Sequence, residues 1–573
     1  MWVIDVVDGC IVEGGIADRY LTLSYVWGGV QTLQATTANI EQLRQPGSLT
    51  RDKVVLPKTI RQAIDVTQLL GERHIWIDQL SILQDDEEHK HGQIKHMAEI
   101  YANSYLTLVA VTGKLADSGL VDDIDQMLNE TPLNKWHDKH HTTAFMDIHS
   151  TWSRRGWTFQ ERVFARRTLS FLDLVPDVAR PGDPCPKSLY WVCQQTWWYD
   201  YHPDPTVTTE SCRSLYQGVT DVWLSQGHRW PNFYRYLKLC ESYSERVFTS
   251  DSDVVIAFAG AATLLAKSFP GGILYGLPVI FFDIALLWNY SGSACAKRPW
   301  DATSDESNRP PSWSWMSWRG RLDTINQAHV FEGMACADDP EEIVYNIPST
   351  VVITPLVQWY FTGVGGAQIA IANEYHKYKH FAQDGESAPP PGWIRAESSS
   401  SSSDSERENV YITPAAPRFE FRFPIPLVDS SCSEITIPMP ISNRITCQAE
   451  HAYFYLHQIK PIGHLEPILL HILDTMRESS GVIRLPGDWH ESHLETEMGV
   501  ELIAISTESR AKYELYHDDY FPREHRKPNG IWDLYNVLWI EWTDGVAYRK
   551  AVGQVTKAAW EAADRELIDV VLG

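Results

Sequence analysis

The N-terminal part of the chain alternates short apolar runs with amphipathic segments, and this alternation limits the possible folds more than any other feature of the sequence. The runs Tyr20–Gly28, His74–Asp78 and Leu106–Val111 are rich in β-branched and aromatic residues, as buried strands are. Between them, Leu56–Gly71 and Gln93–Tyr101 place apolar side chains at helical spacing. Strands that are buried on both faces and separated by helices are typical of a parallel, doubly wound sheet. We therefore predict an α/β unit in which these three strands are parallel neighbours.

Polar and aromatic residues occur where these strands end. Ser24, Trp27 and Gly28 lie at the end of the first strand, and Asp78 ends the second. Ligands of parallel sheets bind beyond the carboxyl ends of the strands. We therefore expect these four residues to lie at one rim of the sheet.

The segment Ser153–Phe171, SRRGWTFQERVFARRTLSF, is expected to supply a further helix that reaches this rim. Glu161 lies in its first turn, after Trp157 and after the pair Arg154 and Arg155. The helix dipole favours a carboxylate at this position, so one interpretation is a glutamate that serves only the helix and pairs with a neighbouring arginine. The other interpretation is a carboxylate that joins the rim residues in a binding site. The residues alone leave both interpretations open.

The composition argues against several classes of protein. A formal net charge of −25 repels phosphate backbones and argues against a nucleic-acid-binding protein. Nine cysteines without a CxxC pair indicate neither a disulfide framework nor a zinc ribbon, and the first residues lack the pattern of a signal peptide. We therefore expect a cytoplasmic location. The most apolar window, Gly271–Tyr290, contains Pro278 and Asp283, which favours a buried strand and helix over stable membrane insertion.

Motifs for cofactors and metals are weak. Gly363–Gly366 lacks the third glycine of a dinucleotide fingerprint, and GxxxxGK[ST] does not occur. The acidic and histidine-rich stretch Asp85–His96 has neither the HExxH spacing nor the carboxylate set of a calcium loop. We predict no metal site and no bound cofactor.

A chain of 573 residues is too long for one hydrophobic core, so several domains are expected. The Ser-rich stretch 397–408 is expected to be a flexible linker. The predicted parts are the α/β domain over residues 1–170, a helical, Trp-rich extension over 171–345, and a β-rich C-terminal region over 346–396 and 409–573.

Two local patterns in the later parts give specific expectations. Arg309–Trp318, RPPSWSWMSW, is compatible with a strand that shows one aromatic face, and we favour core packing of its tryptophans between domains over a platform for carbohydrate or a proline-rich peptide. Asp544 and Gly545 form a dipeptide that predicts the turn of a β-hairpin.

Three motifs together resemble the heterokaryon incompatibility (HET) domain of filamentous fungi. They are YLTLSYVWG, then HIWIDQLSILQDD with QIKHMAEIYANSYLTLVAV, then SRRGWTFQERV. The family usually has a cysteine where this chain has Ser81, so no cysteine nucleophile is expected there. The resemblance implies a role in non-self recognition and programmed cell death, a form of fungal innate immunity. It also implies a distant similarity to the flavodoxin-like fold of the Toll/interleukin-1 receptor (TIR) domain.

Some members of the TIR fold hydrolyse NAD with a glutamate four residues after a tryptophan, the spacing of Trp157 and Glu161. The resemblance thus implies that Glu161 is catalytic and that NAD or a related nucleotide is the substrate. It further implies that Trp27 and Trp157 stack on the substrate and that Arg154 or Arg155 binds the diphosphate. The remaining implied substrate-binding residues are Ser24, Gly28 and Asp78.

The alternative is a death-signalling or scaffold domain without catalysis. The same residues would then form a surface for self-association or for a partner incompatibility protein.

Overall fold

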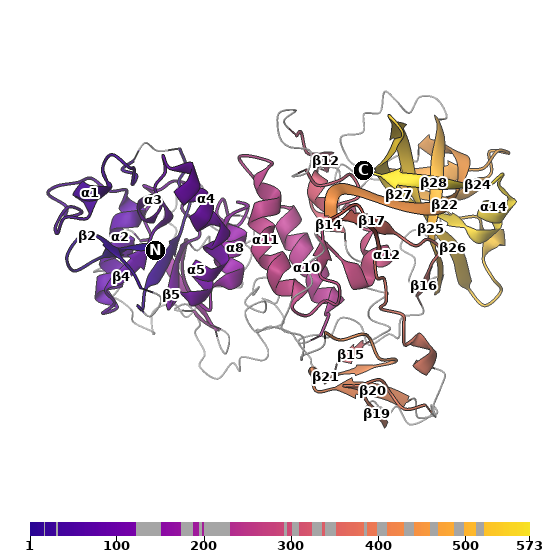
Figure 1. Cartoon of the computed structure of the whole chain (residues 1–573), viewed down its shortest axis with the longest axis horizontal. Helices are drawn as coiled ribbons and strands as arrows, with labels where there is room; N and C mark the ends of the chain where they lie inside the picture. The colour runs from indigo at the N-terminus through magenta and orange to yellow at the C-terminus, as the bar shows by residue number, and fades with distance from the viewer. Residues whose placement is uncertain are drawn as a thin grey trace, which may run out of the picture. The chain divides into compact units, whose positions relative to one another are not determined.

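The computed structural model divides the chain into two compact units (Figure 1). One unit comprises Met1–Gly227 with Ile256–Ala261, and the other comprises His228–Val255 with Ala262–Gly573. The structure describes residues 1–15, 18–29, 32–121, 150–173, 187–193, 197–199, 230–290, 295–300, 309–323, 335–337, 351–382, 387–397, 409–428, 440–458, 468–485, 498–511 and 521–573.

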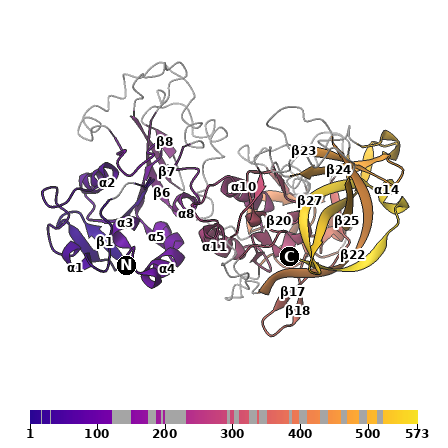
Figure 2. The same ribbon diagram turned by 90° about the horizontal axis from the view of Figure 1, so that it is seen from above.

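The first unit is built on a mixed β-sheet (Figure 2). In spatial order its strands are β2 (Cys10–Glu13), β1 (Trp2–Asp5), β4 (His74–Trp76), β3 (Leu21–Ser24), β5 (Leu106–Ala110), β6 (Arg167–Asp173), β7 (Lys187–Cys193) and β8 (Trp197–Tyr199). The described helices of this unit include α1 (Ile40–Leu43), α2 (Lys58–Leu69), α3 (Asp78–Ser81), α4 (Glu87–Lys95), α5 (Met97–Asn103) and α8 (Thr158–Phe164).

The strands β4, β3, β5 and β6 are parallel neighbours, which confirms the predicted arrangement of the three apolar runs. The expectation of a wholly parallel sheet is wrong, because β1 and β2 pair antiparallel and so do β7 and its two neighbours. Only Val6–Gly9 separates β1 from β2, and this connection is too short for the crossover that a parallel pair needs. β6 ends at Asp173, so the sheet continues past residue 170, where the sequence analysis places the end of the domain.

The two faces of the central strands differ in chemistry. Leu21 and Leu23 belong to the buried apolar cluster that also contains Ile60 of α2, so α2 covers their face of β3. Side chains alternate along a strand, so Thr22 and Ser24 lie on the opposite face. That face is more polar and lies toward α5 and α8, which pack against each other. Ser24 and Glu161 therefore meet on the face of α5 and α8, whereas Tyr25 and Trp27 pack with the cluster on the α2 face.

The second unit begins with helical and aromatic-rich structure. Trp313, Trp315 and Trp318 are buried, which confirms that these tryptophans serve core packing; packing between domains stays a prediction. The strand expected over Arg309–Trp318 is wrong, because the segment forms a short 3₁₀-helix followed by a two-residue strand. The elements of this part are α10 (Phe233–Ser244), α11 (Asp253–Ala266), β9 (Ile273–Leu274), β10 (Leu277–Pro278), η2 (Val279–Phe281), α12 (Phe282–Ala285), β11 (Asn289–Tyr290), β12 (Ala296–Lys297), η4 (Trp315–Ser317), β13 (Trp318–Arg319) and β14 (Leu322–Asp323).

A small antiparallel sheet contains the strands that flank the Ser-rich stretch. Its order is β15 (Ala335–Ala337), β21 (Ala416–Phe421), β20 (Asn409–Thr413) and β19 (Ile394–Glu397). Glu397 pairs with Asn409, so the Ser-rich stretch connects two paired strands. Residues 398–408 themselves lie outside the described residues, and their flexibility stays a prediction.

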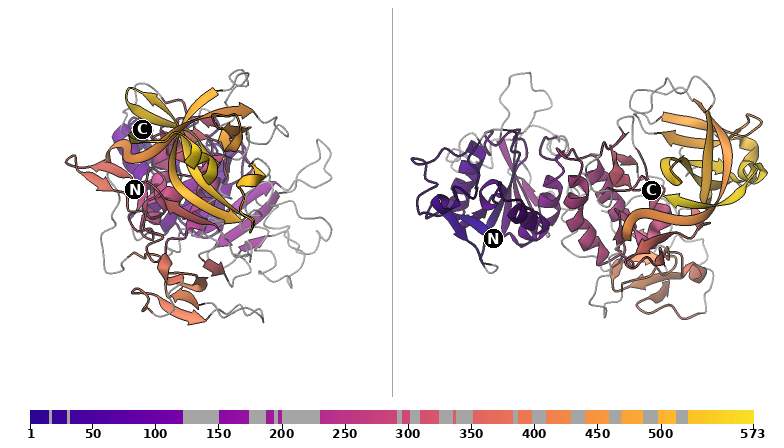
Figure 3. Two further views of the ribbon diagram at one scale, coloured as in Figure 1. Left: turned by 90° about the vertical axis from the view of Figure 1, so that its right-hand side faces the viewer. Right: turned by 45° about the horizontal axis from the view of Figure 1, so that its top comes forward.

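The C-terminal part of the second unit is strand-rich and contains a sheet that closes on itself (Figure 3). β22 (Pro440–Gln458) pairs with β23 (Ile468–Leu473) and also with β25 (Met498–Ala511), which closes the ring through β26 (Ile531–Thr543), β27 (Val546–Thr556) and β24 (Ser479–Leu485). We call this ring the closed sheet. Further strands of the same sheet are β16 (Val352–Pro355), β17 (Tyr360–Gly363), β18 (Gln368–Ala370) and β28 (Glu566–Leu572).

Alternate side chains of the closed sheet form one buried cluster with Trp560 of α14 (Lys557–Ala562). The Trp560 ring stacks on Phe454 and Tyr535, with centroids 5.7 and 5.6 Å away. The predicted hairpin turn is confirmed, because Asp544 and Gly545 connect β26 to β27 with φ of 50° and 75°. Positive φ at both central positions is the geometry that matches the twist of the strands.

The apolar window Gly271–Tyr290 forms the short elements from β9 to β11, so the expected strand-and-helix structure is confirmed. Among the helices of the described ranges, none has the length and apolar character needed to cross a membrane.

One carboxyl group in this window predicts a pH-dependent stability. Asp283 is buried, and burial raises its pKa to about 7, although hydrogen bonds from the Ile284 N–H and from the Asn373 and Tyr375 side chains act in the lowering direction. Because this pKa exceeds the ordinary value of 3.8, neutral Asp283 contributes stability below pH 4 that is lost as the pH rises through about 7. Asp283→Asn is therefore expected to melt near the wild-type temperature at pH 4 and increasingly above it as the pH rises to 8.

Calorimetric melting of the full chain across this pH range checks the prediction. Asp564→Asn, at an exposed position, is the matched control and is expected to follow the wild type throughout. An Asp283→Asn curve parallel to that of the wild type from pH 4 to pH 8 would contradict the assignment.

Candidate functional site

The carboxyl ends of the central parallel strands bring several of the predicted rim residues together. β3 ends at Ser24, and Asp78 follows β4 as the first residue of α3. Glu161 reaches Ser24 from the first turn of α8, as the sequence predicts for its position in the helix. The site is thus assembled from strand ends and helix starts, where side chains project beyond the sheet.

A buried chain of hydrogen bonds holds the Glu161 carboxylate. Trp152 Nε1 donates to Ser24 Oγ at 2.7 Å, and Ser24 Oγ in turn donates to Glu161 Oε2. All three side chains are buried, and Glu161 is 6% exposed. A buried carboxylate requires hydrogen-bond partners, so the bond from Ser24, which Trp152 holds in turn, helps to position Glu161. The Ser24 hydroxyl is occupied as donor and as acceptor within this chain.

Asp78 is the centre of a second polar group. Its Oδ2 accepts a hydrogen bond from Trp27 Nε1 at 2.8 Å, and its Oδ1 accepts one from the Gln79 N–H at 2.8 Å. Burial raises the pKa of Asp78 to about 6, and the bonds from Gln79 and Trp27 and the positive charge of Arg155 counteract part of that rise. Unlike Glu161, the Asp78 side chain is only partly buried. Trp27 and Arg155 thus both act on the Asp78 carboxyl group, one by a hydrogen bond and the other by its charge.

Two buried tyrosines lie close enough to both carboxylates for each negative charge to affect their pKa values. Burial raises the pKa of Tyr25 well above its ordinary value, and the negative charges of Asp78 and Glu161 add to that rise. The same three causes raise the pKa of Tyr101. Tyr25 OH donates to Gln79 Oε1 at 2.8 Å, and Tyr101 OH donates to the Leu23 carbonyl at 3.2 Å. Asp78 and Glu161 therefore act on the same two phenols and belong to one electrostatic site.

The remaining predicted residues lie at the margin of this site. Gly28 has a φ of 71°, and a Cβ atom there would lie 2.8 Å from the Leu115 Cα atom, so the close approach of the chain explains the glycine. Trp157 precedes α8 and is partly exposed, and Arg154 is exposed. No hydrogen bond in the described residues joins the side chain of Arg154 to Glu161 or Asp78. The binding roles of these three residues stay predictions.

Trp152, Tyr25 and Tyr101 also belong to the site, although none of them was among the residues predicted from the sequence. Tyr25 directly follows Ser24 in the YLTLSYVWG motif, and Tyr101 lies on the apolar face of a predicted helix. Trp152 directly precedes the segment chosen for the third motif. A signal was therefore present for each of them, since aromatic residues with a polar atom usually find a hydrogen-bond partner when they are buried.

The arrangement provides a buried carboxylate, a second carboxyl group whose pKa burial raises to about 6, and a nearby guanidinium. Such a set can stabilise positive charge that develops on a substrate and can bind hydroxyl groups. Within the described ranges, no group of three or more His, Cys, Asp and Glu side chains has the geometry of a metal site.

Comparison with known proteins covers this part of the chain. Residues 20–161 match the family model described as Heterokaryon incompatibility protein (HET). Over 142 residues the chain is 28% identical to Heterokaryon incompatibility protein 6, OR allele, of Neurospora crassa. The match covers 22% of this chain and 20% of that relative, so the chain spans about one fifth of the length of the relative. No solved structure matches. The similarity to the TIR fold stays a prediction.

Proposed function

We propose that this protein acts in heterokaryon incompatibility, in which non-self recognition leads to programmed cell death, because residues 20–161 match the HET family model. We further propose that the domain hydrolyses NAD at the bond between nicotinamide and ribose. The observation that carries this proposal is the Glu161 carboxylate, which accepts a hydrogen bond from Ser24 at the carboxyl end of the parallel strands. The charges of Glu161 and Asp78 both raise the pKa values of Tyr25 and Tyr101.

The chemistry needs little more than such a carboxylate. The bond between ribose C1′ and the pyridinium nitrogen breaks, and its electron pair leaves with nicotinamide, which becomes neutral. Positive charge develops at C1′ and on the ring oxygen, as in glycoside hydrolysis, and water then adds at C1′ with loss of one proton. Because the leaving group needs no protonation, a negative charge fixed near the ribose is the main requirement.

Each residue of the site has a separate role in this proposed reaction. Glu161 stabilises the developing positive charge and binds the ribose hydroxyl groups. Ser24 is a positioning residue, because its hydroxyl is already occupied between Trp152 and Glu161. Arg155 binds the diphosphate as a bidentate donor, and Asp78 orients it. Trp27 and Trp157 supply the partly exposed rings on which the bases stack.

The direct test is the release of nicotinamide from NAD by the purified full chain, followed by chromatography. The assay is run over a range of protein concentrations, so that an activity that depends on self-association is also detected. Release that follows the protein concentration supports the proposal. Absence of release at every concentration, from protein whose melting is cooperative, would refute the enzymatic part and leave the role in incompatibility standing.

A second candidate function is a death-signalling or scaffold domain without catalysis. The burial of Glu161 favours it, because a carboxylate that is 6% exposed and bonded to Ser24 also serves to join β3 to α8. Under this function the partner is a second copy of the chain or another incompatibility protein. Cell death on expression that persists without any nicotinamide release would select it over the enzyme.

A positioning role for Trp152 gives a more specific expectation. Trp152→Phe keeps the aromatic packing and removes the donor to Ser24 Oγ, so the Ser24 hydroxyl and the Glu161 carboxylate lose part of their alignment. We expect kcat to fall roughly 10-fold with KM nearly unchanged, which corresponds to the loss of one hydrogen bond. Trp2→Phe in β1 is the matched control and should keep wild-type kcat. Equal kcat values for the two variants would show that Trp152 does not act through Glu161.

A further inference from the structure

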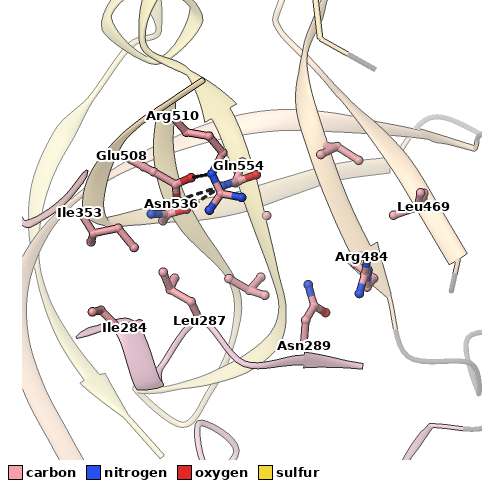
Figure 4. A pocket seen from close by; sticks show the side chains of 13 residues that line it. Ile284, Leu287, Asn289, Ile353, Leu469, Arg484, Glu508, Arg510, Asn536 and Gln554 are labelled. Carbon is pink, nitrogen blue, oxygen red and sulfur yellow. Dashed lines mark hydrogen bonds and ion pairs between the residues drawn. The ribbon is translucent and has the colours of Figure 1, made fainter. Parts of the chain in front are cut away.

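The second unit contains a cavity of about 60 Å³ on the closed sheet, lined on one side by a row of polar side chains (Figure 4). Glu508 and Arg510 of β25 form an ion pair there and are 2% and 1% exposed. Asn536 of β26 and Gln554 of β27 continue the row. Burying such a row costs free energy unless its polar groups have hydrogen-bond partners, so most of them are expected to be bonded to one another.

The carboxylate of Glu508 determines the orientation of the two amides. A carboxylate only accepts hydrogen bonds, so Gln554 must direct Nε2 toward Glu508 Oε2, at 3.0 Å. The same Nε2 donates to Asn536 Oδ1 at 3.2 Å, and Asn536 Nδ2 donates to Ser506 Oγ at 3.1 Å. Both N–H groups of Gln554 are thus used inside the row. Its carbonyl oxygen Oε1 has no donor among the described residues and is the open acceptor of the cavity.

A second amide supplies the complementary donor. Asn289 also lines the cavity, and its Oδ1 accepts a hydrogen bond from the Tyr290 N–H at 3.2 Å. Its Nδ2 is therefore left as a donor. The cavity offers a fixed acceptor on Gln554 and a donor on Asn289, so a complementary ligand brings one donor and one acceptor.

The charges in the lining already compensate each other. Arg510 pairs with Glu508, and Arg484 pairs with Asp323 and also donates to the Tyr290 carbonyl at 2.9 Å. A charged ligand would bring an uncompensated charge into this site and would be penalised for its desolvation. The ligand is therefore neutral.

The rest of the lining limits the shape of the ligand. Ile284, Leu287 and Ile353 form an aliphatic side, and the described lining residues include no aromatic ring on which a sugar or a purine could stack. The volume exceeds the 10–15 Å³ or so that one water needs and suits a head group of a few heavy atoms. A primary carboxamide combines this size with one donor group, one acceptor and no charge.

We propose that this cavity is a binding site for the primary carboxamide group of a small neutral ligand, with Gln554 Oε1 accepting from its amide nitrogen and Asn289 Nδ2 donating to its carbonyl oxygen. The alkyl or other apolar part of the ligand lies along Ile284 and Leu287. The site is separate from Glu161 and does not depend on NAD hydrolysis.

The test uses butanamide as the probe and the full chain with ¹³C-labelled isoleucine methyl groups. Titration is expected to shift the methyl signals of Ile284 and Ile353 saturably. Butyrate and 1-butanol have the same chain length and are expected to bind roughly 10-fold more weakly. Butyrate is charged and has no donor, and 1-butanol carries its donor and its acceptor on one oxygen instead of on two separate atoms. Equal or tighter binding of butyrate or 1-butanol would overturn the proposal, and so would the absence of shifts at both isoleucines with butanamide.

A pair of variants tests the geometry. Asn289→Asp keeps the acceptor for the Tyr290 N–H and removes the donor Nδ2, so butanamide is expected to bind roughly 10-fold more weakly. Asn529→Asp is the matched control, because Asn529 Oδ1 also accepts from a backbone N–H, that of Ile531 at 3.3 Å, but it lies outside the cavity. The control is expected to bind as the wild type does. Unchanged binding in Asn289→Asp would remove Asn289 from the site and overturn the assignment.

Discussion

Trp560→Ala is expected to lower the free energy of unfolding of the second unit by about 3–5 kcal/mol, the range found when a large buried aromatic side chain is truncated. Trp560 is fully buried inside the closed sheet and stacks on Phe454 and Tyr535. Its Nε1 also donates to Glu450 Oε2 at 3.3 Å. Removal of the ring leaves a cavity that the closed sheet cannot easily fill, because its strands are held to one another by backbone hydrogen bonds. Chemical denaturation of the full chain measures the change.

A tryptophan on the surface of the same sheet provides the control. Trp542 is 40% exposed and donates to Glu501 Oε2 at 3.0 Å. Trp542→Ala is expected to cost at most about 1 kcal/mol, since it removes one exposed hydrogen bond and little buried area. Similar losses for the two variants would mean that Trp560 does not support the core of the closed sheet.

Glu161→Gln is expected to lower the rate of nicotinamide release by roughly 100-fold or more, because the substitution removes the negative charge that stabilises the transition state. The glutamine side chain has nearly the same size, and its carbonyl oxygen can still accept the hydrogen bond from Ser24. The change in stability is therefore expected to be about 1 kcal/mol. The experiment measures nicotinamide release and thermal melting on the same preparations.

Glu99→Gln is the control for this variant, since Glu99 is an exposed glutamate of the same unit that pairs with His96. It should keep both the rate and the melting temperature of the wild type. Full activity of Glu161→Gln would end the catalytic assignment. A collapsed melting temperature together with lost activity would instead assign Glu161 a structural role in joining β3 to α8.

Much of the fold was open to prediction because it depends on local patterns. The apolar runs at β3, β4 and β5 and the helical spacing at α2 predicted the parallel centre of the first sheet, which the structure confirms. The Asp544-Gly545 dipeptide predicted the hairpin between β26 and β27 for the same reason. The antiparallel strands at both edges of the first sheet were not predicted. The apolar pattern of a strand shows that it is buried but does not show whether its neighbour runs parallel or antiparallel.

The candidate site shows where such patterns stop being informative. The carboxyl-end rule placed Ser24 and Asp78 at one rim, and the structure brings Glu161 to Ser24 and Arg155 near Asp78. The role of Ser24 was expected to be substrate binding, whereas its hydroxyl lies between Trp152 and Glu161. Residue types and spacing identify candidate side chains. They do not show which groups donate hydrogen bonds to each side chain and which groups accept from it.

The sequence by itself determined the strand and helix segments of the α/β centre and the turn at Asp544, because each of these follows from neighbours within a few residues. It also determined the resemblance of residues 20–161 to the HET family, because motifs of residue types can be compared without a structure. Only the tertiary structure decided that Ser24 meets residues 128 and 137 positions away, that β22 pairs with β25 to close a sheet, and that four polar side chains meet in one cavity. These features depend on how distant helices and strands pack against one another. That packing is determined by the free energy of burying side chains from the whole chain, which no local stretch of sequence shows.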